Sequence, residues 1–122
     1  MGFFSKKVTT WYRVFPSLEE AEKAIPMNRL VAVEIDTKRL CFARTEKGYF
    51  ATDEKCPHQG LPISKGGFCE DGTIVCPFHR YAWNLKSGRE VEKRENNIQL
   101  YPVDIRETGI YIGIEKKVSR LF

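Results

Sequence analysis

Two short segments constrain this chain more than any other part of it. They are Cys56-Pro57-His58-Gln59-Gly60 and Cys76-Pro77-Phe78-His79, with seventeen residues between His58 and Cys76. Each segment supplies one cysteine and one histidine, and the chain has only two histidines in all. Two thiolates and two imidazoles make a complete four-ligand metal site when they are brought together. A fold that uses them this way must hold two loops face to face.

The distribution of these ligands bears on the choice of metal. Structural zinc sites are usually built from one pair of cysteines and one pair of closely spaced histidines or cysteines. Here each segment is mixed, as in a Rieske [2Fe–2S] centre, where one iron keeps two cysteines and the other takes two histidines. Two alternatives stay open on the residues alone: zinc in place of iron, and core cysteines and histidines that bind no metal.

The residues around the ligands extend the likeness. The run CPHQG…G-G…D-G-T-I-V-CPFH…W-N-L-K-S-G resembles the cluster-binding region of a Rieske ferredoxin, and a weaker resemblance continues from Trp11 to about Ile114. It implies an all-β fold, the Rieske antiparallel β-sandwich with a small inserted cluster-binding subdomain. The whole chain, 1–122, is then expected to form a single Rieske domain with the subdomain at about residues 53–85.

The same resemblance assigns the ligands of one [2Fe–2S] cluster per chain. Cys56 and Cys76 are expected to bind the inner iron. His58 and His79 are expected to bind the outer iron, close to solvent, where an electron can leave. The prolines after the cysteines stiffen each loop and remove an N–H beside sulfur.

The class of Rieske protein is indicated by differences from the high-potential members. Leu61 and Phe78 stand where respiratory and photosynthetic subunits have two cysteines joined as a disulfide. Tyr81 and Trp83 stand where those subunits have a Ser and a Tyr that donate hydrogen bonds to sulfur. With fewer donors, the reduction potential is expected at the low end of the Rieske range, roughly −150 mV rather than +300 mV. Arg80 departs from the Gly common in relatives, and its role is left open between raising the potential and contacting a partner.

The rest of the chain predicts mostly β structure with one short helix. Ser17-Leu18-Glu19-Glu20 matches a capping box, which predicts a helix that ends before Pro26. Residues 64–73 are rich in glycine and predict a turn-rich connection. The alternation of apolar and polar residues, with the turn residues between, predicts these strands: Trp11–Phe15, Arg29–Asp36, Arg39–Thr45, Tyr49–Thr52, Ile74-Val75, Gln99–Arg106 and Ile110–Glu115.

Composition agrees with a small carrier protein. A chain of 122 residues can form one core, and no apolar run approaches the ~18 residues that span a membrane. The start of the sequence lacks a secretory signal, so a cytoplasmic location is expected. Cys41 is expected to be a buried small hydrophobic residue and Cys69 to lie in the turn-rich connection, with no disulfide between them.

The net charge is +4, and basic residues gather near the termini. This leaves two interpretations, solvated tails or a docking patch for an acidic partner. Nucleic-acid binding is not expected, because no basic stripe is interleaved with stacking aromatic residues.

The function predicted from the sequence is a one-electron carrier rather than an enzyme. No second iron site can be built once both histidines are used, and no glycine fingerprint for NAD or FAD is present. The expected partners are a flavin- or NAD(P)H-dependent reductase and a terminal oxygenase. One alternative keeps the cluster in the small subunit of a NAD(P)H-dependent nitrite reductase, with its large subunit as partner. Another is a metal- or redox-responsive structural or binding module.

Overall fold

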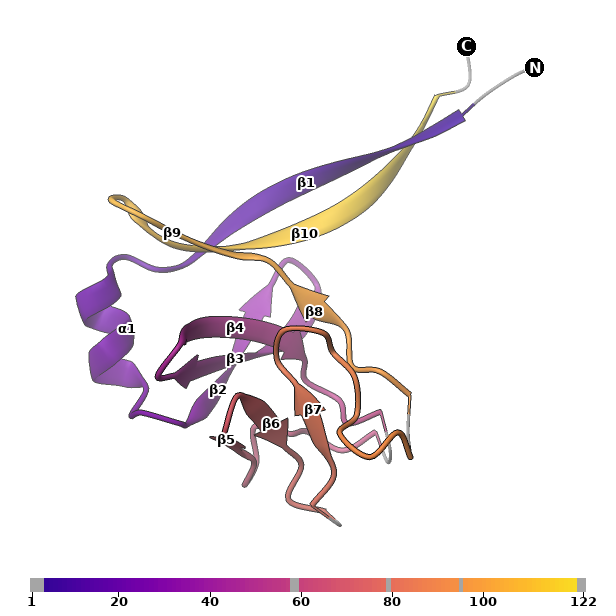
Figure 1. Ribbon diagram of the computed structural model, residues 1–122. Coiled ribbons are helices and arrows are strands. Elements are labelled where there is room, and N and C mark those ends of the chain that lie inside the picture. The colour runs from indigo at the N-terminus through magenta and orange to yellow at the C-terminus, as the bar shows by residue number, and fades with distance from the viewer. Residues whose placement is uncertain (1–3, 58–59, 79, 95, 121–122) are drawn as a thin grey trace.

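Three antiparallel sheets and one short helix make up the part of this protein that the structure describes (Figure 1). The computed structural model describes residues 4–57, 60–78, 80–94 and 96–120, and the side chains of residues 7–57, 60–78, 80–94 and 96–116. The sheet orders are β1-β10-β9, β2-β3-β4-β8 and β5-β6-β7. The elements are β1 (Phe4–Phe15), α1 (Leu18–Ala24), β2 (Leu30–Ile35), β3 (Lys38–Thr45), β4 (Gly48–Asp53), β5 (Phe68–Glu70), β6 (Thr73–Val75), β7 (Ala82–Asn84), β8 (Leu100–Tyr101), β9 (Val103–Arg106) and β10 (Gly109–Arg120).

The sheet β2-β3-β4-β8 is the middle layer, and its strand β3 is buried on both faces. Leu40 and Phe42 belong to one hydrophobic core, whereas Cys41 and Ala43 between them belong to the other. Successive side chains of a strand point to opposite faces, so this alternation means that β3 separates two cores. A strand covered on both sides is expected to be apolar at every position, as residues 40–43 are.

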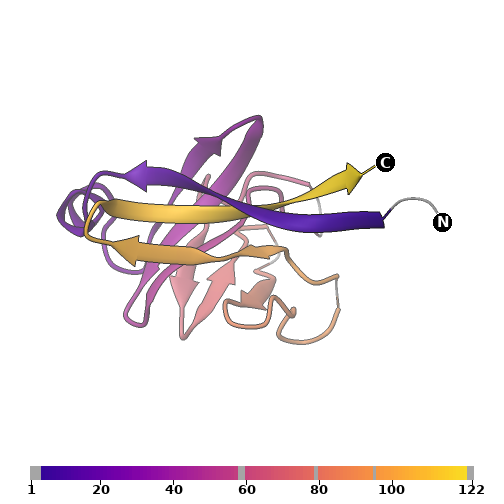
Figure 2. The same cartoon turned by 90° about the horizontal axis from the view of Figure 1, so that it is seen from above.

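One core lies between the middle sheet and the sheet β1-β10-β9, which forms the β-sandwich predicted from the sequence. Ile110, Ile112 and Ile114 on β10 contribute alternate side chains to it, and Ala21 and Ile25 close one end from α1 and its C-cap. Figure 2 shows β1, β10 and β9 side by side across the top of the molecule.

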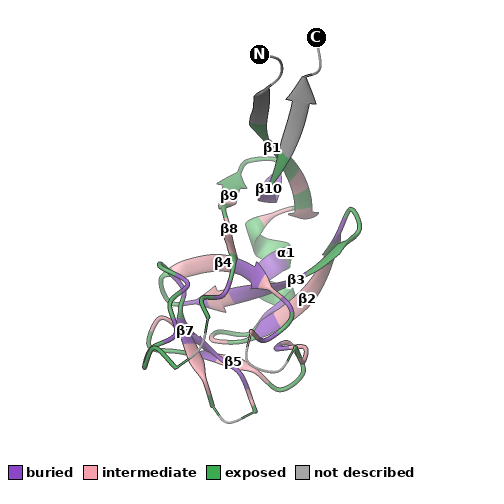
Figure 3. Ribbon diagram, turned by 90° about the vertical axis from the view of Figure 1, so that its right-hand side faces the viewer, coloured by how far each residue is buried: buried purple, intermediate pink, exposed green. Residues whose placement is uncertain are grey.

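The second core lies on the other face of the middle sheet, against the small sheet β5-β6-β7. It contains all four cysteines of the chain together with Ile74 on β6 and Trp83 on β7. Trp83 is fully buried although it lies in a three-residue strand. Figure 3 shows buried residues in both the middle sheet and this small sheet, so the small sheet is packed onto the rest rather than projecting from it.

The predicted helix is present, and Ser17 is its N-cap. The Ser17 hydroxyl accepts a hydrogen bond from the backbone N–H of Glu20 at 3.1 Å, and α1 ends at Ala24, two residues before Pro26. Arg44 on β3 then donates to the carbonyl oxygen of Ile25 at 2.9 Å, which satisfies one of the carbonyl groups at the C-terminal end of the helix. No helix in the described part of the chain is long and apolar enough to cross a membrane.

The strands differ from the prediction in four places, one of which is β7, a strand that was not predicted. The connection predicted as turn-rich contains β5, and Cys69 lies buried in that strand rather than in a turn. Pro102 divides the strand predicted at residues 99–106 into β8 and β9, because proline lacks the N–H that a continuous strand would use.

β1 and β10 run well past their predicted ends and pair from Phe4↔Arg120 to Phe15↔Ile110. The basic residues near the termini therefore lie in a paired two-stranded ribbon rather than in irregular tails, and Lys7 and Lys116 are exposed there. Figure 1 shows the ribbon extending beyond the remaining sheets, with both termini at its end.

Candidate metal centre

Two loops of equal size follow two strands and place the predicted cysteines. The Cys56 N–H donates to the Leu61 carbonyl at 2.8 Å, and the Cys76 N–H donates to the Tyr81 carbonyl, also at 2.8 Å. Each bond joins a cysteine to the residue five positions later, so each loop is closed at its base. The backbone is left-handed four positions after each cysteine, with φ of +71° at Gly60 and +54° at Arg80. We call residues 56–61 the first ligand loop and residues 76–81 the second ligand loop.

The two loops bring the Cys56 and Cys76 side chains together in the second core, between the middle sheet and the small sheet β5-β6-β7. Cys56 is 1% exposed and Cys76 is fully buried. Burial raises the pKa of the Cys76 thiol to about 11, a hydrogen bond from the Phe78 backbone N–H acts in the opposite direction, and the adjacent Cys56 thiol raises it. The Cys76 thiol keeps its proton unless a cation replaces it, and two adjacent buried sulfur atoms are chemically suited to bind a metal as thiolates.

His58 and His79, the other two predicted ligands, lie outside the described residues. Among the side chains that the structure does describe, no group of three or more Cys, His, Asp or Glu residues is arranged to hold a metal ion. The geometry therefore brings the two predicted sulfur ligands together, and the assignment of all four ligands stays a prediction.

Glu54 anchors the first ligand loop from two residues before Cys56. Its carboxylate is 5% exposed, accepts a hydrogen bond from the Ser64 backbone N–H at 3.0 Å and a short one from the Ser64 hydroxyl, and lies 3.8 Å from the Arg39 Nε. The Glu54 carbonyl also accepts from the Ile63 N–H at 2.8 Å. The chain entering the loop is thereby tied to the chain leaving it, and a buried carboxylate is tolerated because its oxygens are bonded.

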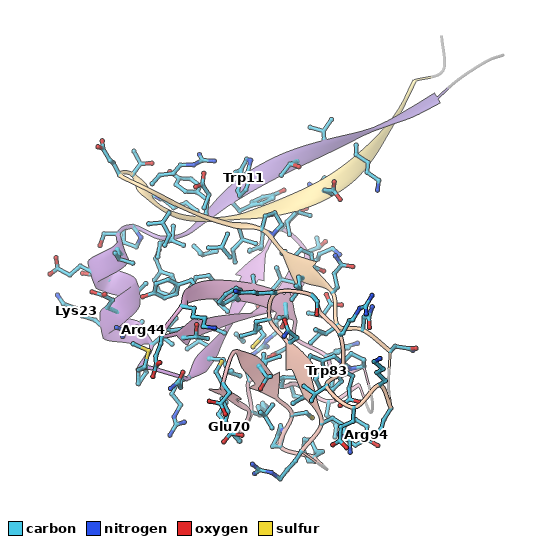
Figure 4. The ribbon with its side chains drawn as sticks, in the orientation of Figure 1. Trp11, Lys23, Arg44, Glu70, Trp83 and Arg94 are labelled. Atoms are coloured by element: carbon cyan, nitrogen blue, oxygen red, sulfur yellow. The ribbon has the colours of Figure 1, made fainter. Side chains whose placement is uncertain are left out.

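Glu90 supports the second ligand loop through Arg94 and Tyr81. The Glu90 carboxylate is 2% exposed and accepts from the Arg94 N–H at 2.6 Å and from the Arg94 guanidinium at 3.1 Å. Burial alone would raise the pKa of Glu90, but these bonds and the one from the Glu92 N–H outweigh it and lower the pKa to about 2. The guanidinium also lies 4.0 Å above the Tyr81 ring, at the base of the loop. Figure 4 labels Arg94 and Trp83 at this end of the molecule.

Gly67 is the residue that lets the two loops approach each other. A Cβ atom at this position would lie 2.4 Å from the Ile63 carbonyl oxygen and 2.9 Å from the Val75 carbonyl oxygen. Ile63 follows the first ligand loop and Val75 directly precedes Cys76, so the backbone of Gly67 passes between the two ligand segments. Only glycine permits this close passage of three backbone segments.

Trp83 uses its only hydrogen-bond donor away from the cysteines. Its indole Nε1 donates to the Asn96 carbonyl at 2.9 Å, and its ring packs in the second core. Trp83 therefore packs beneath the second ligand loop. Tyr81 is half-buried against the same core, with its ring 6.4 Å from that of Trp83.

The two further cysteines lie in the same core but not in either loop. Cys41 is fully buried, as expected for a small hydrophobic residue, and burial raises its pKa well above the ordinary range. Burial raises the pKa of Cys69 to about 12. Neither thiol is disposed to ionise, and all four cysteines are free thiols.

Sequence reasoning identified the cysteines but missed Glu54, Glu90 and Gly67. A signal for Glu54 was available, because an acid two residues before a predicted metal ligand is well placed to anchor a ligand loop. No local sequence pattern indicated a role for Glu90, because its partner Arg94 lies in a segment whose composition is that of a polar loop. Gly67 was counted among turn glycines, whereas its role is close packing.

Comparison with known proteins agrees with this arrangement. Residues 10–102 match the family described as the Rieske [2Fe–2S] domain. The ferredoxin component of the naphthalene 1,2-dioxygenase system of Pseudomonas aeruginosa is 31% identical to this chain over 91 residues, which are 74% of this chain and 86% of that protein.

Two solved structures share the fold. The ferredoxin of carbazole 1,9a-dioxygenase from Nocardioides aromaticivorans superimposes with a TM-score of 0.71 at 19% identity, over 84% of this chain and 96% of that one. The putative NADH-dependent nitrite reductase small subunit from Mycobacterium tuberculosis superimposes with a TM-score of 0.67 at 18% identity, over 96% of this chain and 98% of that one.

Proposed function

This chain belongs to the Rieske [2Fe–2S] domain family, and from that premise we propose that Cys56, His58, Cys76 and His79 are the ligands of its cluster. When bound, a Rieske cluster takes up and releases one electron at a time. The observation that carries the ligand proposal is the pair of buried, adjacent thiols, each presented by a loop of the same size and closure.

The protein residues contribute rigidity and exclusion of water. The base of each ligand loop is closed by a backbone hydrogen bond, and each is supported by a buried glutamate, Glu54 for the first and Glu90 for the second. Loops fixed in this way change little in geometry when the charge of the site changes by one electron, which is a requirement for rapid electron transfer. The Phe78 backbone N–H that faces Cys76 also favours the thiolate over the thiol.

The protein is an electron carrier of the kind found in oxygenase systems, since its relative from P. aeruginosa is the ferredoxin component of such a system. We propose that it accepts single electrons from a flavin- or NAD(P)H-dependent reductase and passes them to a terminal oxygenase, with no catalytic activity of its own. The sequence supports the last point, because its only two histidines are both assigned to the cluster.

A second candidate is the small subunit of a NAD(P)H-dependent nitrite reductase. It is favoured by one observation, the superposition on the M. tuberculosis protein over 96% of this chain. Stable co-purification with a large sirohaem subunit would select this alternative, whereas a protein isolated alone that is re-reduced by a separate reductase would select the oxygenase system.

We place the cluster-binding subdomain at residues 53–85 of a single domain spanning 1–122. The small sheet β5-β6-β7 and both ligand loops lie within that interval. A cytoplasmic location stays a prediction, which fractionation of the producing cells tests.

An anaerobic redox titration followed by electron paramagnetic resonance tests the proposed function. A reversible one-electron signal with the low average g-value of mixed Cys and His ligation is the expected result. Because Trp83 donates to Asn96 and not towards a cysteine, the midpoint is expected near the low end of the Rieske range, roughly −150 mV. A colourless zinc protein, or a cluster that does not cycle, would favour the structural or binding module instead.

A further inference from the structure

A cavity of about 640 Å³ lies beside the first ligand loop. It is bounded by the turn between β2 and β3 on one side and by the chain entering and leaving the loop on the other. Gly60, within the loop itself, forms part of its wall. We call this cavity the basic groove, and its lining residues are Thr37, Lys38, Arg39, Asp53, Glu54, Lys55, Gly60, Pro62 and Lys65.

The two carboxylates of the basic groove are already engaged. Asp53 accepts a hydrogen bond from the Tyr101 hydroxyl at 2.5 Å. Glu54 is bonded to Ser64 and lies 3.8 Å from Arg39. Among the described residues, neither carboxylate forms an ion pair with a lysine of the groove, and the one arginine and three lysines of the groove outnumber its two carboxylates.

Those lysines are exposed, and among the described residues none of them forms an ion pair. Within the described part of the chain, Lys38, Lys55 and Lys65 have no carboxylate within 4 Å, and the Lys38 ammonium instead lies 5.9 Å from the centre of the Tyr101 ring. A lysine that is exposed and unpaired keeps its full charge available to a binding partner.

The charge of the groove is local and does not reflect a generally basic surface. Five of the twenty Lys and Arg residues and one of the sixteen acids lie in residues 1–10 and 114–122, so fifteen of each sign remain between them. Residues 11–113 are therefore neutral overall, so the excess of positive charge in the groove is a local feature. Because the field of such charges fades over about 8 Å at physiological salt, it acts only on a surface that has come close to the first ligand loop.

We propose that the basic groove receives an acidic segment of the protein that exchanges electrons with this carrier. The proposal rests on the proposed function, since only a redox partner needs to approach the first ligand loop. The lysines come from two separate segments and are all exposed, an arrangement that fits several carboxylates spread along a peptide. A compact phosphate site would instead need donors that converge from buried side chains, backbone N–H groups or arginine forks.

A labelled acidic peptide tests the proposal without the natural partner. Fluorescence anisotropy would measure the binding of a fluorescein-labelled hexaglutamate peptide to the cluster-loaded protein at low salt. The groove variant combines Lys38→Gln, Lys55→Gln and Lys65→Gln. A matched control variant combines Lys7→Gln, Lys47→Gln and Lys86→Gln, which remove the same charge from exposed positions elsewhere.

The expected result is that the groove variant binds the peptide about tenfold more weakly, with a shallower dependence on salt, while the control variant changes less than about threefold. Equal weakening in both variants would overturn the proposal, because it would show an effect of net charge only. Displacement of the peptide by inorganic phosphate at equal concentration would also overturn it, in favour of a site for small anions.

The spectrum of the cluster separates this proposal from the proposed function. Both variants are expected to keep the wild-type electron paramagnetic resonance signal, because none of the six lysines lies in a ligand loop. If the groove variant keeps a normal signal and shows no selective loss of peptide binding, the proposal for the groove is refuted while the proposed function stands. Absence of the signal from the wild-type protein would refute the proposed function.

Discussion

The two ligand loops share one backbone design and differ in what supports it. Both join Cys N–H to the carbonyl five residues later, and both use a left-handed residue at the fourth position after the cysteine. The first loop has glycine there, for which this conformation has no steric cost, and a glutamate bonded mainly to a neutral serine. The second has Arg80 there and a glutamate bonded to Arg94. The same loop geometry is thus reached with a glycine and a neutral hydrogen-bond partner in the first loop, and with an arginine and a charged partner in the second.

Removing a histidine ligand has the largest expected effect and tests whether the two loops are equivalent as ligand donors. His58→Ala and His79→Ala are each expected to abolish the Rieske-type electron paramagnetic resonance signal, because either change leaves one iron short of a ligand. Replacement by Cys instead of Ala serves as the control, since it can support a four-thiolate cluster with a different signal. A native signal in either alanine variant would remove that histidine from the proposed site.

The second-largest effect is expected from Gly67→Ala, which adds a methyl group where the two ligand loops approach each other. Gly67→Ala is expected to lower the free energy of unfolding by about 3 kcal/mol, because its Cβ would overlap the carbonyl oxygens of Ile63 and Val75. The matched control is Gly60→Ala, where a Cβ would meet no atom within 4 Å and only the left-handed backbone costs about 1 kcal/mol. Urea unfolding measures both, and similar losses in the two variants would show that Gly67 does not set the approach of the loops.

The charged support of the second loop predicts a dependence on pH. Glu90→Gln is expected to cost about 2 kcal/mol at neutral pH, because an amide cannot accept as strongly from Arg94. The pKa of Glu90 is lowered from 4.5 to about 2 on folding, so its stabilising effect is complete above pH 4.5 and is lost as pH falls towards 2.

Unfolding of wild type and Glu90→Gln between pH 7 and pH 3 measures this difference. The gap between the two proteins should narrow below pH 4.5, and a constant gap would mean that the charge of Glu90 is not the source. Glu54→Gln, measured in the same way, serves as the comparison on the first-loop side.

Arg80 gives the smallest expected change and separates backbone strain from charge. Arg80→Gly should alter the free energy of unfolding by less than about 1 kcal/mol, since relief of the left-handed strain at φ +54° offsets loss of the contact with the Phe68 ring. Arg80→Ala removes the same charge but keeps the strain, so it should be the less stable of the two. Both should have a lower reduction potential than wild type, because a cation beside the second ligand loop favours the reduced state. An unchanged potential in both variants would assign Arg80 no part in tuning it.

Features fixed by short-range patterns were predictable from the sequence alone. The ligand motifs gave the cysteines and their loops, the capping box gave α1, and alternation gave the β2–β3 hairpin. These succeed because each depends on residues within a few positions of one another. β5 was missed because three residues between glycines carry too little pattern, and its strand character comes from pairing with β6.

Tertiary structure decided everything that depends on residues meeting from distant segments. The sequence determined the family and the all-β class, because these depend on short motifs and on the alternation of apolar and polar residues along the chain. It did not determine that Glu90 supports the second ligand loop, that Gly67 separates Ile63 from Val75, or that three lysines from two segments line one groove beside Gly60. Those relations depend on distances between residues that are far apart in the sequence, and these distances are set only when the folded chain packs.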